Sequence, residues 1–150
     1  MKKTLLLLLA LTLLWGLASC SRPVEVGIVT VRTGVGDYTP AAYPIFMQSR
    51  DGTVTDSARQ QPMEVLGELP IIPLFGELEI LLDGETAGTP AYTLYDSDGG
   101  EVYWRQEVFS LPQESGSYVV SLEVTWGNDR EFYGYQYLFR LATESCPAPE

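Results

Sequence analysis

Two alternating segments near the end of the sequence constrain the fold most. Every second residue is apolar in each: Tyr118, Val120, Leu122, Val124 and Trp126 in the first, and Tyr133, Tyr135, Tyr137, Phe139 and Leu141 in the second. A period of two places alternate side chains on opposite faces of a β-strand, so each set is expected to share one face. Gly127, Asn128 and Asp129 lie between the segments and favour a turn. The sequence therefore predicts two long, neighbouring antiparallel strands.

Shorter stretches of the same kind come earlier in the chain. They occupy residues 24–31, 43–48, 53–55, 77–82, 91–95 and 101–105, with residues 107–111 as a further candidate. Asp51-Gly52 and residues 96–100 predict hairpin turns, because glycine adopts positive φ without steric cost. Between residues 56 and 76, several prolines and glycines exclude a long helix, so we expect an irregular segment with at most one helical turn. About seven or eight strands with so little helical periodicity predict an all-β antiparallel sandwich.

The residues at the start of the first long strand indicate a more specific fold class. Glu114, Gly116 and Tyr118 stand at alternate positions, a pattern that resembles the start of strand F in immunoglobulin-like domains. In that family the tyrosine forms a tyrosine corner, and its hydroxyl bonds to upstream backbone; Tyr118 is the matching residue. Val120 stands where immunoglobulins carry a cysteine, so hydrophobic packing is expected in place of the intersheet disulfide. The resemblance implies one immunoglobulin-like β-sandwich over residues 24–141.

The beginning of the sequence has the features of an export signal. Lys2 and Lys3 precede an apolar run over residues 5–15, which is shorter than the roughly 20 residues that a membrane-spanning helix needs. Leu17-Ala18-Ser19-Cys20 then resembles the bacterial lipobox, in which the cysteine is acylated and becomes the first residue of the mature protein. The alternatives are a secretory signal with an incidental cysteine, or a buried helix.

The lipobox resemblance implies a cellular location for the domain. Residues 1–19 would be a lipoprotein signal peptide, Cys20 would carry acyl chains such as palmitate, and residues 20–23 would form a short tether. The domain would then be extracytoplasmic and anchored to the bacterial cell membrane. Ser21 stands where some lipoproteins carry the aspartate that retains them at the inner membrane, so an outer-membrane site stays open in a Gram-negative cell.

The composition of the mature part excludes several classes of function. From residue 20 onward there are 7 arginines, no lysine and no histidine, against 20 carboxylates, which gives a formal charge of −13. That charge repels nucleic acid and anionic lipid. Without histidine or lysine there is no His-ligated zinc, no Ser-His-Asp triad and no Schiff-base chemistry. We expect neither an enzyme nor a cofactor or metal site.

The second cysteine is left without an internal partner if Cys20 carries lipid. Cys146 lies in a Pro-flanked stretch, residues 142–150, which we expect to be a disordered tail. A lone thiol cannot form an internal disulfide, so it is either a spare group or a site of intermolecular pairing. The fold is therefore expected to depend on its hydrophobic core.

Three groups of side chains are candidates for a site. Residues 96–101 resemble part of a calcium loop but lack its later ligands, so a solvated hairpin turn is preferred. The carboxylate pair Glu77 and Glu79 is expected to face solvent, where nothing perturbs its acidity. Aromatic faces can stack on sugar rings, but those of the second long strand are needed for the core. The aromatics expected to be more exposed, where a contiguous apolar patch would mark a partner site, are Tyr38, Tyr43, Tyr95, Tyr103 and Phe132.

These observations predict a monomeric, lipid-anchored extracytoplasmic protein with a binding or structural role at the cell envelope. Its partner would be an envelope protein or a glycan, and the sequence names neither. The alternative is an accessory, inhibitory or sensing protein that acts on an extracytoplasmic enzyme through its loops, with residues 33–43 or 56–76 as the candidates.

Overall fold

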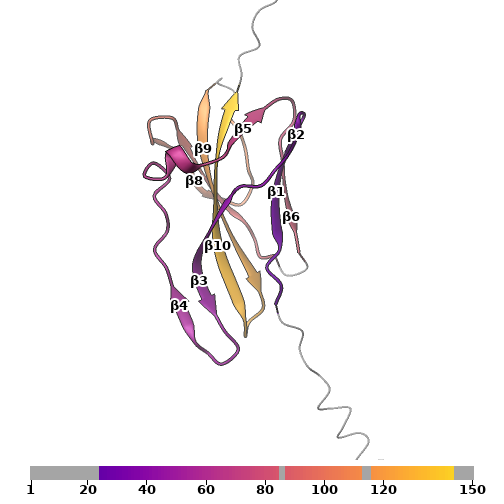
Figure 1. Ribbon diagram of the computed structural model, residues 1–150, viewed down its shortest axis with the longest axis vertical. Helices are drawn as coiled ribbons and strands as arrows, with labels where there is room; N and C mark the ends of the chain where they lie inside the picture. Colours follow the sequence, from indigo (N-terminus) through magenta and orange to yellow (C-terminus); the bar gives the residue numbers. More distant parts are fainter. Residues whose placement is uncertain (1–23, 85–86, 113–115, 144–150) are drawn as a thin grey trace, which may run out of the picture.

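The computed structural model describes residues 24–84, 87–112 and 116–143 (Figure 1). These residues form the strands β1 (Ile28–Thr33), β2 (Gly36–Tyr38), β3 (Ala41–Gln48), β4 (Val54–Asp56), β5 (Ile71–Leu74), β6 (Glu79–Asp83), β7 (Ala91–Asp96), β8 (Glu101–Gln106), β9 (Ser117–Gly127) and β10 (Phe132–Thr143), and one 3-10 turn, η1 (Leu66–Glu68). The lipobox, the signal peptide, the tether, Glu114 and Cys146 lie outside the described residues. No helix among the described residues is long and apolar enough to cross a bilayer.

The strands form two sheets that face each other, so the predicted all-β sandwich is confirmed. The small sheet has the order β2-β1-β6, and the large sheet has the order β4-β3-β10-β9-β7-β8, with β5 added to β10. The described strands number ten instead of seven or eight, because β2 lies in a stretch considered a loop and β5 in the stretch expected to be irregular; the candidate strand at residues 107–111 does not form. Within the large sheet, β7, β9 and β10 have the C-F-G order of an immunoglobulin domain, whereas the small sheet has three strands where the constant-type domain has four.

Strand β10 is the centre of the large sheet. It pairs with β9 along its whole length, from Phe132 opposite Gly127 to Ala142 opposite Ser117. Its other edge is shared: β3 runs antiparallel to its first half, and β5 runs parallel to its last four residues. Ala142, which was expected to belong to the tail, is paired with both β5 and β9, and Thr143 is paired with β5.

Pro73 in β5 explains why this strand was not predicted from the sequence. Pro73 interrupts the apolar run and has no N–H to donate, a property that argues against a central strand. Among the described strands β5 pairs only with β10, and an edge strand tolerates such a residue. Ile72 next to it is fully buried and holds the strand against the core.

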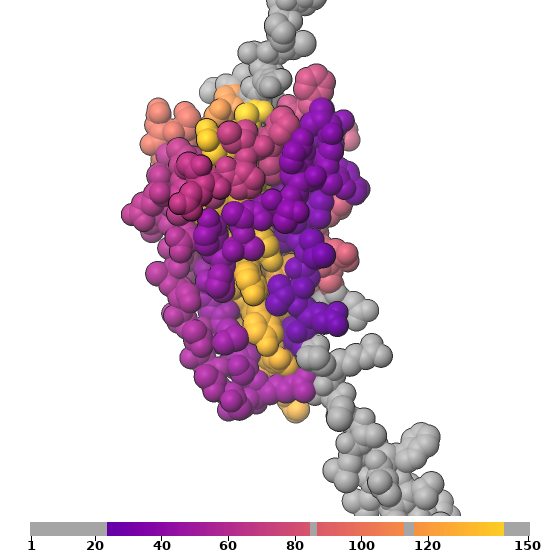
Figure 2. Space-filling view, viewed as in Figure 1, coloured from indigo at the N-terminus to yellow at the C-terminus, as the bar shows by residue number. Residues whose placement is uncertain are grey.

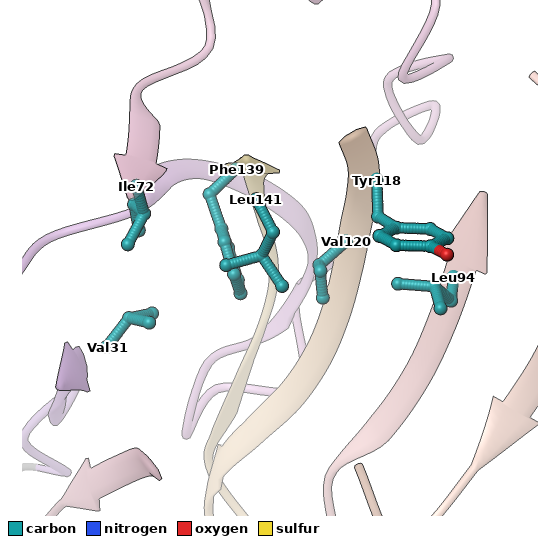
Figure 3. Packing of buried hydrophobic residues seen from close by; sticks show 7 residues of the cluster. All are labelled: Val31, Ile72, Leu94, Tyr118, Val120, Phe139 and Leu141. Atoms are coloured by element: carbon teal, nitrogen blue, oxygen red, sulfur yellow. The ribbon is translucent and has the colours of Figure 1, made fainter. Parts of the chain in front are cut away.

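The core lies between the two sheets (Figure 3). Val31 from the small sheet faces Val120, Phe139 and Leu141 of the large sheet. Ile72 of β5 lies beside Leu141 in the large sheet, and Tyr118 packs beside Leu94 and Val120. Tyr118 is the second residue of β9 and is buried. Its role as a tyrosine corner, including the bond from its hydroxyl, stays a prediction. A second cluster around Trp126 and Tyr137 continues the core toward the other end of the sheets.

The large sheet is buried on both faces over part of its area. Residues 57–70, named here the crossing segment, run over the outer face, away from the small sheet (Figure 2). Leu69 of this segment packs on Val119 of β9 and Leu138 of β10, with Val65 and Leu66 beside them. β9 and β10 therefore carry apolar residues on their outer face as well, where the crossing segment covers them.

Candidate functional site

A groove lies on the outer face of the large sheet, along the border of the crossing segment. Its volume is about 290 Å³. Residues 59–62 form one wall, β7 and the edge strand β8 form the other, and β9 and β10 form the floor. We call it the outer-face groove; the residues of the sheet that line it are Thr93, Tyr95, Trp104, Arg105, Ser121, Glu123 and Gln136.

An ion-pair cluster lies at the floor of this groove. Arg59 donates from Nε to Oε1 of Glu123 at 2.7 Å and from Nη2 to Oε2 at 3.1 Å, and Arg105 Nη1 donates to Oε2 at 2.7 Å. The Glu123 side chain is only 18% exposed. Burial raises the pKa of this carboxyl, but the hydrogen bonds and charges of the two arginines outweigh burial, so the pKa is lowered overall. One carboxylate thus holds two guanidinium groups at the groove.

Arg105 reaches Glu123 through an unusual backbone. Its φ is 47°, and it is the one non-glycine residue with positive φ in the described parts of the chain. The register of β7 against β8 shifts nearby, and the Arg105 N–H donates to the Thr93 hydroxyl at 3.3 Å. A left-handed arginine costs about 1–2 kcal/mol. Such strain is concentrated at functional positions.

A buried amide ties the crossing segment to the floor. Gln136 of β10 accepts a hydrogen bond from the Gln60 N–H at 2.8 Å and donates to the Gln60 carbonyl at 3.1 Å. Its Nε2 also donates to the Ser121 hydroxyl at 3.0 Å. The backbone of Gln60 is therefore paired as if by a neighbouring strand, which fixes this wall of the groove.

Trp104 is the exposed aromatic residue of the groove. It is 66% exposed on β8, and the guanidinium carbon of Arg105 lies 6.0 Å from its ring centre. Trp104 was not among the aromatics predicted to be exposed. The signal for it was its position next to Tyr103, because adjacent residues of a strand point to opposite faces of the sheet. The prediction of which aromatics are exposed was wrong: Tyr38, Tyr43, Tyr95, Tyr103 and Phe132 are all partly buried.

Those five rings are covered because each packs on an apolar cluster or on another ring. Tyr38 and Tyr103 extend the main core, while Tyr43 and Tyr95 pack on the cluster under the crossing segment. Phe132 meets Phe46 edge to face, with ring centres 5.7 Å apart. Besides Trp104, Phe75 is a strongly exposed aromatic residue in the described chain.

The carboxylates considered as sites from the sequence lie outside the outer-face groove. Oδ1 of Asp96 accepts hydrogen bonds from the backbone N–H groups of Asp98 and Gly100, at 2.9 and 2.7 Å, and so closes the predicted hairpin turn. Glu77 and Glu79 are exposed, and Glu79 lies 3.9 Å from a nitrogen of Arg32. Within the described ranges, no group of three or more acidic or cysteine side chains is arranged to hold a metal ion.

The two loop regions considered from the sequence meet at one end of the molecule. The Gly34 N–H, in the turn between β1 and β2, donates to the Phe75 carbonyl, after β5, at 2.8 Å. Val35 and Phe75 are both more than half exposed. In Figure 1 this end lies opposite the end where the described chain begins. We call it the distal tip.

At low pH, protonation of Glu123 should weaken the attachment of the crossing segment to the large sheet. The folded-state pKa of Glu123 is lowered, so its contribution to stability is present above the pKa of the unfolded chain and is lost as pH falls through the folded-state pKa. We expect Glu123→Gln to be roughly 1–2 kcal/mol less stable than the wild type at pH 7. The two should converge as the pH falls below the folded-state pKa of Glu123, as measured by urea unfolding at a series of pH values. Parallel pH profiles would contradict this role of Glu123.

Comparisons of this chain with protein-family models, curated proteins and solved structures found no match, so the outer-face groove is interpreted from its own geometry.

Proposed function

We propose that this chain is a membrane-anchored extracytoplasmic lipoprotein whose β-sandwich binds a component of the cell envelope in the outer-face groove. The observation that carries the binding role is Trp104, an exposed indole at the rim of a polar groove. Large aromatics are enriched where proteins bind partners, because they supply contact area at a small cost in side-chain entropy. The strained backbone of Arg105, on the same strand as Trp104, also favours this groove as the binding surface.

The lipobox resemblance supports the anchored location. Only Ser21, Arg22 and Pro23 separate Cys20 from the start of the described domain. The mature charge of −13 opposes electrostatic docking to anionic lipid, so attachment would depend on the acyl chains. A domain held this close would meet envelope components near the membrane surface.

The binding role is tested by sedimentation with isolated cell envelopes. All described strands lie within residues 28–143, so a lipid-free chain of residues 21–150 contains the whole sandwich. We expect Trp104→Ala to reduce envelope binding about tenfold or more, as loss of a central aromatic does. Phe75→Ala, which removes a similarly exposed ring at the distal tip, should bind like the wild type. Equal binding by the wild type and Trp104→Ala would exclude the groove as the binding surface.

A second candidate function rests on the distal tip. Val35 and Phe75 form exposed apolar positions on two loops joined by a hydrogen bond, at the end away from the start of the domain. Such a tip suits an accessory or inhibitory protein that contacts an extracytoplasmic enzyme through its loops. This role predicts the reverse result, in which Phe75→Ala loses envelope binding and Trp104→Ala keeps it.

A further inference from the structure

We propose that the outer-face groove binds an acidic sugar residue, a pyranose ring that carries a carboxylate, within an anionic glycan. The proposal rests on the proposed function and names the class of its ligand. At about 290 Å³ the groove lies at the small end of ligand sites, which suits one or two sugar rings. Its three chemical features are the indole of Trp104, the guanidinium groups at Glu123, and two buried hydroxyls.

Trp104 supplies the flat apolar surface. One face of a pyranose ring consists of C–H groups, and these groups stack on the electron-rich face of an indole. Trp104 lies on β8, the edge strand of the large sheet, and is 66% exposed beside the groove. A sugar that covers this exposed ring removes apolar surface from water, which favours stacking.

The arginines supply the charge selectivity. A guanidinium group has five N–H donors, and among the described contacts the side-chain hydrogen bonds of Arg59 and Arg105 go to Glu123 alone. Arg105 uses a single N–H there and shares the carboxylate with Arg59. Asp56 acts on Arg59 by its charge, so Arg105 is the less compensated of the two. A ligand carboxylate therefore finds its partner at Arg105, in a chain that is otherwise strongly acidic.

Two buried hydroxyls supply donors for sugar oxygens. Thr93 and Ser121 line the groove and are 7% and 5% exposed. Each oxygen accepts a hydrogen bond, from the Arg105 N–H and from the Gln136 amide respectively. In the described structure neither hydroxyl hydrogen has a protein acceptor. Because both residues line the groove, an oxygen of a sugar bound there can accept a hydrogen bond from each hydroxyl.

The same edge of the sheet is unsuited to an extended peptide. A peptide that added a strand to β8 would need a regular row of backbone donors and acceptors. The left-handed backbone of Arg105 breaks that row near the end of β8. The groove thus favours a compact ring with several hydroxyls over a strand.

The test compares trigalacturonate with its methyl ester, which has the same rings and no charge. Titration of residues 21–150, followed by NMR or calorimetry, should give at least about tenfold tighter binding of the acid than of the ester. Arg105→Gln should remove this preference and keep ester binding, whereas Trp104→Ala should abolish binding of both. The proposal is overturned if acid and ester bind equally, if neither binds, or if Trp104→Ala binds like the wild type.

Failure of this inference is distinguishable from failure of the proposed function. If envelopes still bind in a Trp104-dependent manner while trigalacturonate does not, the groove has another ligand and only the acidic sugar is excluded. Envelope binding that survives periodate oxidation of glycans but not protease digestion would identify a peptide partner and overturn the sugar proposal. If neither envelopes nor the sugar bind, both proposals fail.

Discussion

Trp126→Ala is expected to lower the free energy of unfolding by about 3–5 kcal/mol, the usual cost of removing a large buried aromatic side chain. Trp126 is fully buried in β9, and its Nε1 donates to the Tyr137 hydroxyl at 3.2 Å. The loss therefore combines a cavity with a buried hydroxyl that loses its partner.

The position of Trp126 between the two sheets explains why the cavity should not collapse. A Cβ at Gly27, just before β1, would overlap the indole ring and the Asp83 carbonyl, and one at Gly84, just after β6, would also meet the ring. The glycines let the backbone of the small sheet approach this one side chain. Shortening it leaves a space that two paired strands cannot fill without giving up their register.

The measurement is urea unfolding of residues 21–150, followed by far-UV circular dichroism. Trp104→Ala is the matched control, because it removes the same side chain from an exposed position. It should change stability by no more than about 0.5 kcal/mol. Similar losses of unfolding free energy in the two variants would show that Trp126 does not hold the two sheets together.

Cys20→Ala is expected to abolish lipid attachment of the full-length chain. The lipobox resemblance places the acyl chains on Cys20 as the first residue of the mature protein, and two or more chains are what makes membrane anchoring stable. Labelled palmitate should be incorporated by the wild type and not by the variant. Palmitate is the primary readout, because the apolar run at residues 5–15 can hold an unprocessed chain at the membrane.

Cys146→Ala is the control for this experiment, since it removes the other cysteine of the chain. It should keep the palmitate label and stay with membranes washed in high salt. Incorporation of label by Cys20→Ala, or its loss from Cys146→Ala, would show that the lipobox assignment is wrong.

The parts of the fold that were predictable from the sequence are those set by local pattern. The long pair β9 and β10 follows the two-residue period, and the hairpins at Asp51-Gly52 and at residues 96–100 follow turn chemistry. Asp96 illustrates why, because its carboxylate bonds to backbone only two and four residues away. Short-range interactions of this kind are visible in a short stretch of sequence.

The candidate site was not predictable because long-range contacts build it. Gln60 meets Gln136 and Arg59 meets Glu123, pairs separated by 76 and 64 residues. No local period distinguishes a loop that crosses a sheet from one that projects into solvent. The exposure of Trp104 follows from the place of β8 at the edge of the large sheet, which depends on strand order.

The double pairing of β1 has a mechanical consequence for a domain held by its beginning. β1 is bonded to β6 over residues 28–32 and to β2 over residues 31–33, both antiparallel. In Figure 1 the chain enters β1 from the end opposite the distal tip. A load on Phe75 at the distal tip, resisted where the described chain begins, would reach β6 and pull β6 and β1 past each other along their common axis. Hydrogen bonds perpendicular to that axis would then share the force in shear, and the strand would resist extraction as one unit.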